Sequence, residues 1–168
     1  MKRINLFLLL SGLMVTVLYN SCKKEGQSPI QGLFTSGSWQ LASILVFNYT
    51  GNILISTDTL NTTCDSVQRF TFTGNTCTYT NFDCIAQKSA SATWTLSPNQ
   101  LFLYANVVCK DTTKAGSSMP FTNAAIQNLG QFSLVLQTGD IQPNYSLTKP
   151  RRIMQYGFIN IKALGTTP

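Results

Sequence analysis

A β-hairpin predicted within residues 63–85 constrains the fold of this chain more than any other segment. Two stretches in which apolar residues alternate with threonine flank Gly74-Asn75, a pair typical of a two-residue hairpin turn. With this turn, the facing pairs are Phe72–Cys77 and Phe70–Tyr79. One face of the hairpin is then apolar, and the other is made of threonines: Thr71, Thr73, Thr76, Thr78 and Thr80. Such a strand pair packs one face on a core and exposes the other to water.

The same register places Cys64 almost opposite Cys84, at the open end of the hairpin. The chain has 5 cysteines. With Cys22 set aside, the remaining four indicate disulfides in an exported domain, with three possible connectivities. The hairpin register favours Cys64–Cys84, which would close a loop of about 20 residues. Cys77–Cys109 then follows by elimination. A zinc site is the competing interpretation, and it is disfavoured because the chain has no Cys-x-x-Cys pair and no histidine.

The N-terminal segment is typical of export. Lys2-Arg3 precede an apolar run over residues 4–18 that is too short for an ordinary transmembrane helix. Ser21-Cys22, followed by two lysines, resembles a bacterial lipoprotein signal of the Bacteroidetes type. The resemblance implies that Cys22 is lipidated and anchors the protein to a membrane. The alternative is a cleaved secretory signal that leaves Cys22 as an ordinary thiol.

These features divide the chain into three parts. Residues 1–21 are predicted to be a signal peptide. Residues 22–36, which are rich in Gly, Ser, Gln and Pro, are predicted to be a flexible tether. Residues 37–164 are predicted to form one domain, because short apolar or alternating stretches recur there between turn residues. Outside the hairpin these stretches are 37–47, 53–57, 93–96, 101–108, 121–129 (a strand or a short helix), 132–136 and 152–164. No amphipathic helix is evident, so the pattern predicts an all-β antiparallel barrel or sandwich.

Several short motifs occur in a fixed order along this domain. They are Gly37-Ser38-Trp39, Cys64-Asp65, the strand 68–73 with Gly74-Asn75, Cys84, Ala92-Thr93-Trp94-Thr95-Leu96, and the apolar stretch 126–136. This order is similar to the lipocalin-like domain of lipoproteins of the Bacteroidetes type. The resemblance implies an up-and-down β-barrel of about eight strands, tethered to a membrane and enclosing a cavity. The two-cysteine arrangement of that family also supports Cys64–Cys84.

Aromatic residues on the predicted strands are the candidates for the barrel interior. We expect Trp39 to close one end of the barrel as part of the core, rather than to contact a ligand. The residues expected to point inward and line an apolar ligand pocket are Phe70, Phe72, Tyr79, Trp94 and Tyr104. A small barrel can also fill its interior with side chains, so a packed core without a ligand is the alternative.

The residue inventory offers little catalytic chemistry, and we expect neither an enzyme nor a cofactor or metal. There is no histidine, the one glutamate (Glu25) lies in the predicted tether, and the five aspartates lie singly in predicted loops. The proposed bridge predicts that Asp65 and Asp83 approach each other, so a carboxylate pair for acid–base chemistry or calcium binding is the alternative. Three triplets resemble the O-glycosylation acceptor of exported Bacteroidetes proteins, with Thr59, Ser66 and Thr112 as acceptors in predicted loops.

The low and scattered charge of the chain further limits the kinds of partner that it is expected to bind. Only 11% of the residues are charged, and the formal net charge of +6 is spread over scattered cations, so nucleic-acid binding is not expected. We therefore expect a cell-envelope protein, lipid-anchored to the outer membrane, that binds a small apolar or amphiphilic molecule in its barrel. The competing hypothesis is an accessory or adhesion protein with a packed core that acts through loops 110–118 and 139–150. Which side of the membrane the protein faces is left open.

Overall fold

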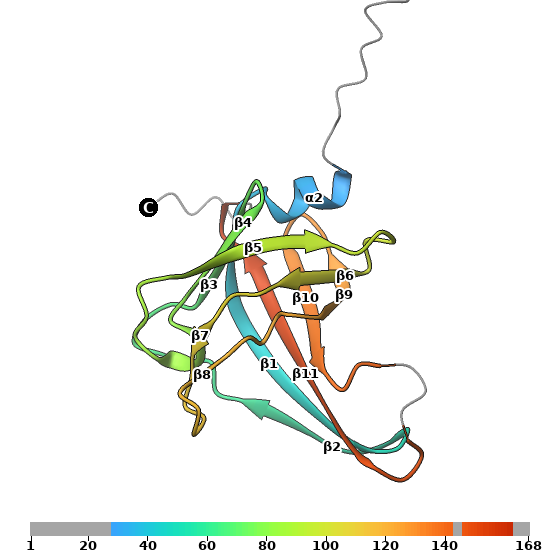
Figure 1. Ribbon diagram of the computed structural model, residues 1–168. Helices are drawn as coiled ribbons and strands as arrows, with labels where there is room; N and C mark the ends of the chain where they lie inside the picture. Colours follow the sequence, from blue (N-terminus) through green and yellow to red (C-terminus); the bar gives the residue numbers. More distant parts are fainter. Residues whose placement is uncertain (1–27, 143–145, 163–168) are drawn as a thin grey trace, which may run out of the picture.

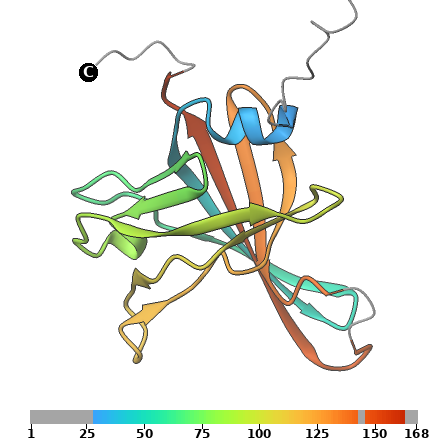
Figure 2. The ribbon, with the colours of Figure 1, turned by 45° about the horizontal axis from the view of Figure 1, so that its top comes forward.

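Eight strands form a closed antiparallel barrel in the computed structural model, which describes residues 28–142 and 146–162. In barrel order they are β1 (Ser38–Thr50), β3 (Arg69–Thr73), β4 (Thr76–Thr80), β5 (Ala90–Leu96), β6 (Phe102–Ala105), β9 (Ala124–Leu129), β10 (Ser133–Gly139) and β11 (Pro150–Asn160). The sheet closes because β11 pairs with β1 (Figures 1 and 2). Barrel order follows chain order, so the predicted up-and-down barrel is confirmed and the sandwich alternative is wrong.

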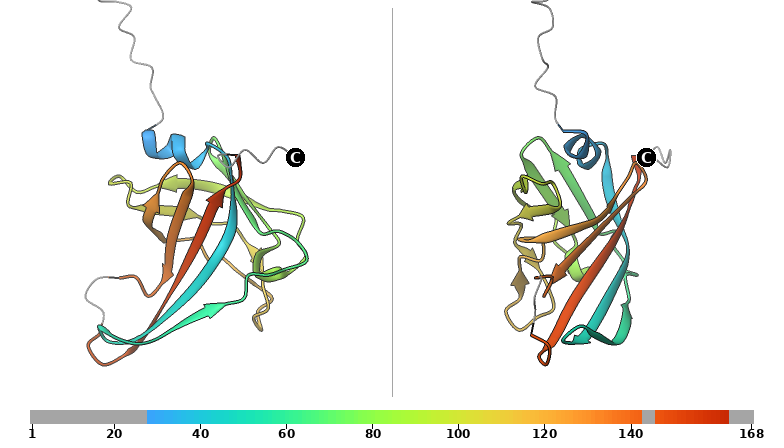
Figure 3. Two further views of the ribbon diagram at one scale, coloured as in Figure 1. Left: turned by 180° about the vertical axis from the view of Figure 1, so that it is seen from behind. Right: turned by 90° about the vertical axis from the view of Figure 1, so that its right-hand side faces the viewer.

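Four short elements and the longer strand β2 lie outside this closed ring. Strand β2 (Ile53–Leu60) pairs with β1 beyond the point where β3 does, and it forms the free end of the sheet. Strands β7 (Cys109–Lys110) and β8 (Ser117–Ser118) form a small hairpin inside a segment predicted to be loop. A 3-10 turn, η1 (Phe82–Cys84), follows β4, and helix α2 (Pro29–Phe34) precedes β1. Figure 3 shows β2 extending from the barrel with the lower halves of β1 and β11.

The central hairpin has the predicted register. Phe72 pairs with Cys77 and Phe70 pairs with Tyr79 across β3 and β4. All four side chains are at most 1% exposed, whereas the threonines on the opposite face are half-buried or exposed. Gly74 adopts the left-handed conformation (φ 54°) that the two-residue turn requires.

Helix α2 lies across one end of the barrel, which we call the closed end (Figures 1 and 2). The Ser28 hydroxyl accepts a hydrogen bond from the Gln31 N–H (3.1 Å), and Pro29 begins the helix, an arrangement typical of a helix start. Phe34 at its end is fully buried, and its carbonyl accepts a hydrogen bond from Trp39 Nε1 (2.9 Å). The predicted flexible tether is therefore wrong for residues 29–34. Residues 1–27, including Cys22 and the predicted signal peptide, lie outside the described residues.

Aromatic side chains fill the closed half of the barrel. The Phe34 ring lies 4.9 Å from that of Phe72 and 5.4 Å from that of Trp94. Phe70 continues the cluster toward Phe121, at a ring distance of 4.8 Å. Trp39 is fully buried at this end, as predicted for a residue that closes the barrel.

The part of the chain that the structure describes contains no helix long and apolar enough to cross a membrane.

The cysteines divide into one disulfide and two free thiols. Cys64 and Cys84 form the predicted bridge, with a Cα–Cα distance of 5.3 Å. Cys77 and Cys109 are unbridged and buried, so the pairing inferred by elimination is wrong. Each occupies the core as a small apolar side chain. Burial raises the pKa of Cys77 to about 11 and that of Cys109 to about 12, so both remain protonated at neutral pH.

Candidate functional site

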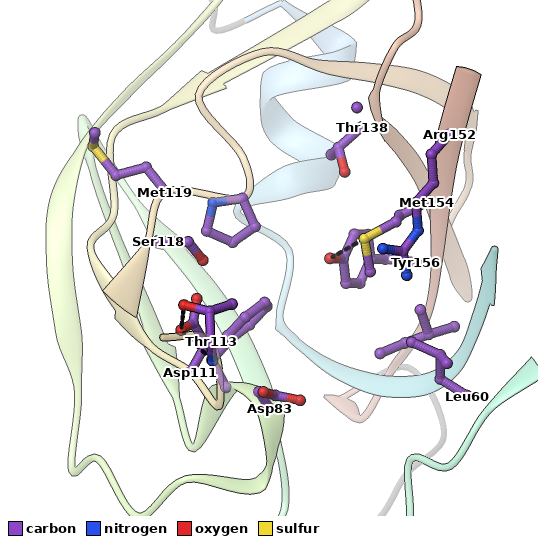
Figure 4. Close-up of a pocket in the computed structure, with 14 residues that line it drawn as sticks. Leu60, Asp83, Asp111, Thr113, Ser118, Met119, Thr138, Arg152, Met154 and Tyr156 are labelled. Carbon is purple, nitrogen blue, oxygen red and sulfur yellow. Dashed lines mark hydrogen bonds between the residues drawn. The ribbon is translucent and has the colours of Figure 1, made fainter. Parts of the chain in front are cut away.

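A cavity of about 480 Å³ opens at the barrel end opposite α2, and we call it the open-end cavity. Its apolar wall consists of Ile44, Leu60, Phe82, Met119, Pro120, Met154 and Tyr156. Its polar lining comprises Asp83, Asp111, Thr113, Ser118, Thr138, Gly139 and Arg152. Figure 4 shows the η1 and β7–β8 side of the cavity facing the β11 side. A hollow that is apolar with a few polar groups is the usual form of a small-molecule site.

The turn η1 places Phe82 and Asp83 at the cavity with an unusual backbone. Asp83 and Cys84 both adopt left-handed conformations, with φ of 53° and 59°. Non-glycine residues rarely do so, and such strain persists only where the surroundings enforce it. Here the Cys64–Cys84 disulfide fixes one end of the turn. The buried Gln68 side chain fixes the other, because its Oε1 accepts hydrogen bonds from the Asp83 N–H (3.2 Å) and the Tyr79 hydroxyl (3.4 Å).

Asp111 begins the loop that connects β7 to β8 and is only 8% exposed. Its Oδ1 accepts hydrogen bonds from the Thr113 N–H (3.1 Å) and the Thr113 hydroxyl (2.6 Å). Its Oδ2 is buried without a hydrogen-bond partner of good geometry. The hydroxyls of Ser118 and Thr113 beside the carboxylate hold the pKa of Asp111 below its ordinary value. Asp111 is therefore ionised at neutral pH.

Thr112 links the two carboxylates. Its N–H donates a hydrogen bond to Asp83 Oδ2 (2.8 Å), and its hydroxyl donates to the same oxygen (2.5 Å). Asp83 and Asp111 thus line the same side of the cavity, although 27 residues separate them in the chain. The sequence suggested Asp65 as the neighbour of Asp83 instead; Asp65 is exposed in the preceding loop and is not part of the cavity lining.

Strand β11 supplies the opposite wall through Arg152, Met154 and Tyr156 (Figure 4). The Tyr156 hydroxyl contacts Met154 Sδ at 3.7 Å. Burial raises the pKa of Tyr156 to about 12, and the nearby Asp83 charge adds to this rise. Arg152 is exposed, and its backbone N–H donates to Asp140 Oδ2 (2.9 Å). Within residues 28–142 and 146–162, no carboxylate forms an ion pair with its guanidinium.

The residues predicted to line a ligand pocket are mostly elsewhere. Phe70, Phe72, Tyr79 and Trp94 point inward, as predicted, but they belong to the aromatic core and do not line the open-end cavity. Trp94 does border a separate hollow of about 330 Å³ beside α2. Tyr104 is 40% exposed, so its predicted inward position is wrong. Its neighbours Leu103 and Ala105 point inward in its place, because side chains alternate along β6.

Of the three predicted glycosylation acceptors, Ser66 and Thr112 lie exposed in irregular segments. Thr59 lies in strand β2, so its predicted loop position is wrong. Thr112 already uses its hydroxyl to hold Asp83.

Among the described residues, no group of His, Cys, Asp and Glu side chains is arranged to hold a metal ion.

The sequence indicated only weakly which residues line the cavity. Tyr156 and Met154 belong to the alternating face of the last strand, whereas Phe82 and Asp111 lie in short segments without periodicity. Searches with family models, curated proteins and solved structures find no match to this chain. The arguments about function therefore rest on the geometry of the chain itself.

Proposed function

We propose that the protein is a lipid-anchored, lipocalin-like barrel of the cell envelope that binds a small amphiphilic molecule in the open-end cavity. The observation that carries this proposal is the division of the barrel interior. An aromatic core fills the closed half, and a cavity of about 480 Å³ occupies the other. Small-molecule sites span roughly 300–1,000 Å³ and combine an apolar lining with a few polar groups.

The lining favours an amphiphile over a wholly apolar molecule. Phe82, Met154 and Tyr156 offer apolar surface. Asp83, Asp111 and Arg152 would remain in contact with the same ligand, and burying a charged group without a partner is costly. A ligand with a polar end can satisfy these groups while its apolar end contacts the rings.

The proposed lipid anchor is consistent with the end of the barrel at which the described chain begins. The described chain begins at Ser28 at the closed end, so an anchor at Cys22 would attach on the side opposite the cavity. The cavity would then face away from the membrane surface. Intact-mass analysis of the N-terminal peptide from the native host tests the anchor: acyl chains on Cys22 are expected, and a free Cys22 thiol would contradict it.

A second candidate function is supported by strand β2. Ile53, Leu54 and Ile55 are 70%, 49% and 63% exposed on a strand with a free edge. Exposed apolar edges promote pairing with another chain. This surface favours an accessory protein that acts through contacts outside the barrel, although the alternative drawn from the sequence placed such contacts in loops 110–118 and 139–150 and not on β2.

A titration with N-phenyl-1-naphthylamine, a neutral apolar dye, tests the proposed binding function. We expect saturable fluorescence enhancement in the wild-type protein. Met154→Trp would fill the cavity and abolish the enhancement, whereas Leu101→Trp, at a residue 56% exposed outside the cavity lining, would leave it unchanged. Saturable binding that Met154→Trp does not affect would place the dye elsewhere. Absence of uptake across a broad set of lipophilic dyes would refute the proposal and favour the accessory function.

A further inference from the structure

Strand β2 and the adjoining parts of β1 and β11 extend beyond the barrel as a three-stranded arm (Figures 1 and 3). Among the described residues, the three most exposed large apolar side chains are Leu147 (78%), Ile53 (70%) and Ile55 (63%). All three lie at the outer end of this arm, which we call the arm tip (residues 49–55 and 147–151). Exposed apolar residues that gather in one place usually mark an interaction surface.

Backbone contacts join the two segments of the arm tip. Thr50 pairs with Pro150 across β1 and β11. The Gly51 N–H donates a hydrogen bond to the Lys149 carbonyl (3.0 Å). Gly51 also adopts the left-handed conformation (φ 60°), and a Cβ atom there would collide with the Leu147 carbonyl. The segment 147–151 is therefore held against the β1–β2 turn, and the exposed apolar side chains belong to one surface.

Cations lie directly behind the first apolar row. Ile53 pairs with Thr50 at the end of the sheet, and Lys149 is exposed beside this row. Arg151 pairs with Tyr49 one row back, about 3.4 Å along the strands. Its guanidinium lies 5.4 Å from the centre of the Tyr49 ring, which directs it along the outer face of the arm.

The two carboxylates of the arm lie further from its end. Asp140 is beside Arg152, whose N–H donates to Asp140 Oδ2 (2.9 Å), and Arg152 pairs with Asn48 about 7 Å behind the first row. Asp58 lies about 14 Å behind that row, and its Oδ2 accepts a hydrogen bond from Asn48 Nδ2 (2.7 Å). From the end inward, the arm thus presents apolar side chains, then cations, then carboxylates.

This order matches the structure of a bilayer surface that contains anionic lipids. Apolar side chains of a surface-bound protein enter about 5–10 Å into the boundary between headgroups and acyl chains. Lysine and arginine remain at the headgroup level, where their charges meet lipid phosphates and their stems cover apolar surface. With Ile53 and Leu147 inserted, Lys149 and Arg151 would lie at that level, and Asp58 would stay in water.

Pairing of β2 with the same strand of a second copy accounts for less of this surface. The register between β1 and β2 skips Ile55, which forms a bulge at the tip. Bulges interrupt the hydrogen-bond ladder of an edge strand and disfavour the addition of another strand. The regular part of β2 is residues 56–60, which carry polar side chains except for Leu60. The apolar residues at the tip lie outside it.

We propose that the arm tip inserts into the surface of a bilayer that carries anionic lipids. This inference goes beyond the proposed binding function and does not depend on it. Helix α2 and the proposed anchor lie at the opposite end of the barrel, so this bilayer would be a second one, facing the membrane that holds the anchor. Leu60 and Arg152 belong to the arm and line the open-end cavity, so the cavity would open near this second bilayer.

Flotation with vesicles tests this inference. Both hypotheses about the N-terminus give a mature chain that begins at Cys22, so the protein used is residues 22–168 with Cys22→Ser, which carries no acyl chain. We expect it to float with phosphatidylcholine vesicles that contain about 30% phosphatidylglycerol, and to bind pure phosphatidylcholine at least tenfold more weakly, because each cation near an anionic surface contributes about fivefold. Added salt should weaken the binding.

Paired variants assign the binding to the arm tip. Ile53→Ser should weaken it about tenfold, because an inserted aliphatic side chain is lost; Leu101→Ser, at a residue 56% exposed outside the arm, is the matched control. Lys149→Gln should weaken it about fivefold, whereas Lys114→Gln, at an exposed lysine between β7 and β8, should have little effect. Circular dichroism of each variant verifies folding.

A tryptophan at the tip reports insertion directly. In Ile53→Trp, emission should shift to shorter wavelength on binding anionic vesicles, and lipids brominated on their acyl chains should quench it. The native Trp39 and Trp94 are buried and give a constant background. Leu101→Trp is the control and should show neither change.

Several results would overturn the inference. Failure to float with anionic vesicles would do so, as would equal flotation of Ile53→Ser and its parent, which would place the contact elsewhere. Binding that Lys149→Gln weakens and Ile53→Ser does not would mean attraction to the surface without insertion. A dimer in sedimentation that Ile53→Ser dissociates, without vesicle binding, would assign the tip to a second copy. None of these results would alter dye binding in the cavity, which tests the proposed function separately.

Discussion

The packing of α2 against the closed end makes a specific prediction for Phe34→Ala. Phe34 is fully buried, its ring lies 4.9 Å from Phe72 and 5.4 Å from Trp94, and its carbonyl receives the Trp39 indole N–H. Truncation removes the ring and leaves a cavity that this rigid aromatic cluster cannot close. Phe→Ala changes at such sites cost about 3–5 kcal/mol. For a domain of this size, the melting temperature should fall by roughly 10–15 °C.

Urea-induced unfolding followed by tryptophan fluorescence measures this effect directly. The 2 tryptophans of the chain, Trp39 and Trp94, both contact Phe34, so the signal reports the closed end. Phe132→Ala is the matched control, because that phenylalanine is 54% exposed and should lose less than about 0.5 kcal/mol. A loss below about 1 kcal/mol for Phe34→Ala, with an unchanged slope of the transition, would refute α2 as part of the core.

Three further predictions concern the cysteines and strand β2. Replacing Cys64 and Cys84 together by serine should lower the free energy of unfolding by about 3 kcal/mol, because the bridge spans 20 residues; a shift in the urea midpoint measures it. The thiols of Cys77 and Cys109 should not react with a disulfide reagent at pH 8 until the protein unfolds, because their pKa values are raised to about 11 and about 12. Ile55→Lys should change stability by less than about 0.5 kcal/mol and reduce self-association, because this side chain is 63% exposed on a free edge.

The buried thiols also set a pH dependence. Their folded-state pKa values lie above the ordinary value of 9.0, so the folded state holds these protons more tightly than the unfolded state. Their contribution to stability is complete below pH 9 and is lost as the pH rises through about 11 to 12. Unfolding titrations at pH 7, 8 and 10.5 should therefore show a clear decline only in the last.

Each of these predictions has a result that contradicts it. A serine double variant with an unchanged midpoint would mean that the bridge does not restrain η1. Rapid labelling of native Cys77 or Cys109 would show that the core opens readily or that these residues are accessible. A large loss of stability in Ile55→Lys would mean that β2 is buried against part of the protein or a partner.

The hairpin of β3 and β4 was predictable because its register depends on local chemistry. Gly74-Asn75 fixes the turn, and alternation then fixes which side chains face the core. Closure of the sheet depends less on local chemistry, because β1 pairs with β11 at the other end of the chain. It followed from the number and spacing of the strands and from the resemblance to lipocalin-like domains.

Helix α2 was missed because its six residues have little helical propensity, with a proline and a glycine among them. It forms because Phe34 is buried against the barrel, which is a tertiary effect. One local signal was present: Ser28 followed by Pro29 is a typical helix start. In a segment rich in glycine, serine and glutamine, this signal alone was not enough to predict a helix.

The position of the cavity could not be derived from alternation alone. Alternation shows that Phe70 and Trp94 point inward, but not how far along the barrel axis they lie. The apolar run over residues 101–108 also hid the alternation that turns Tyr104 outward. Asp83 and Asp111 meet only because η1 and the β7–β8 hairpin fold against each other through Thr112, a contact that neither segment predicts by itself.

The position of a bound probe tests the central claim, that the open-end cavity is the binding site, most directly. Met119 and Met154 line this cavity, and their ε-methyl groups can be observed by NMR after carbon-13 labelling. Titration with N-phenyl-1-naphthylamine should shift both resonances together, with the dissociation constant found by fluorescence. Saturable binding that shifts neither methyl group would place the ligand elsewhere and contradict the account.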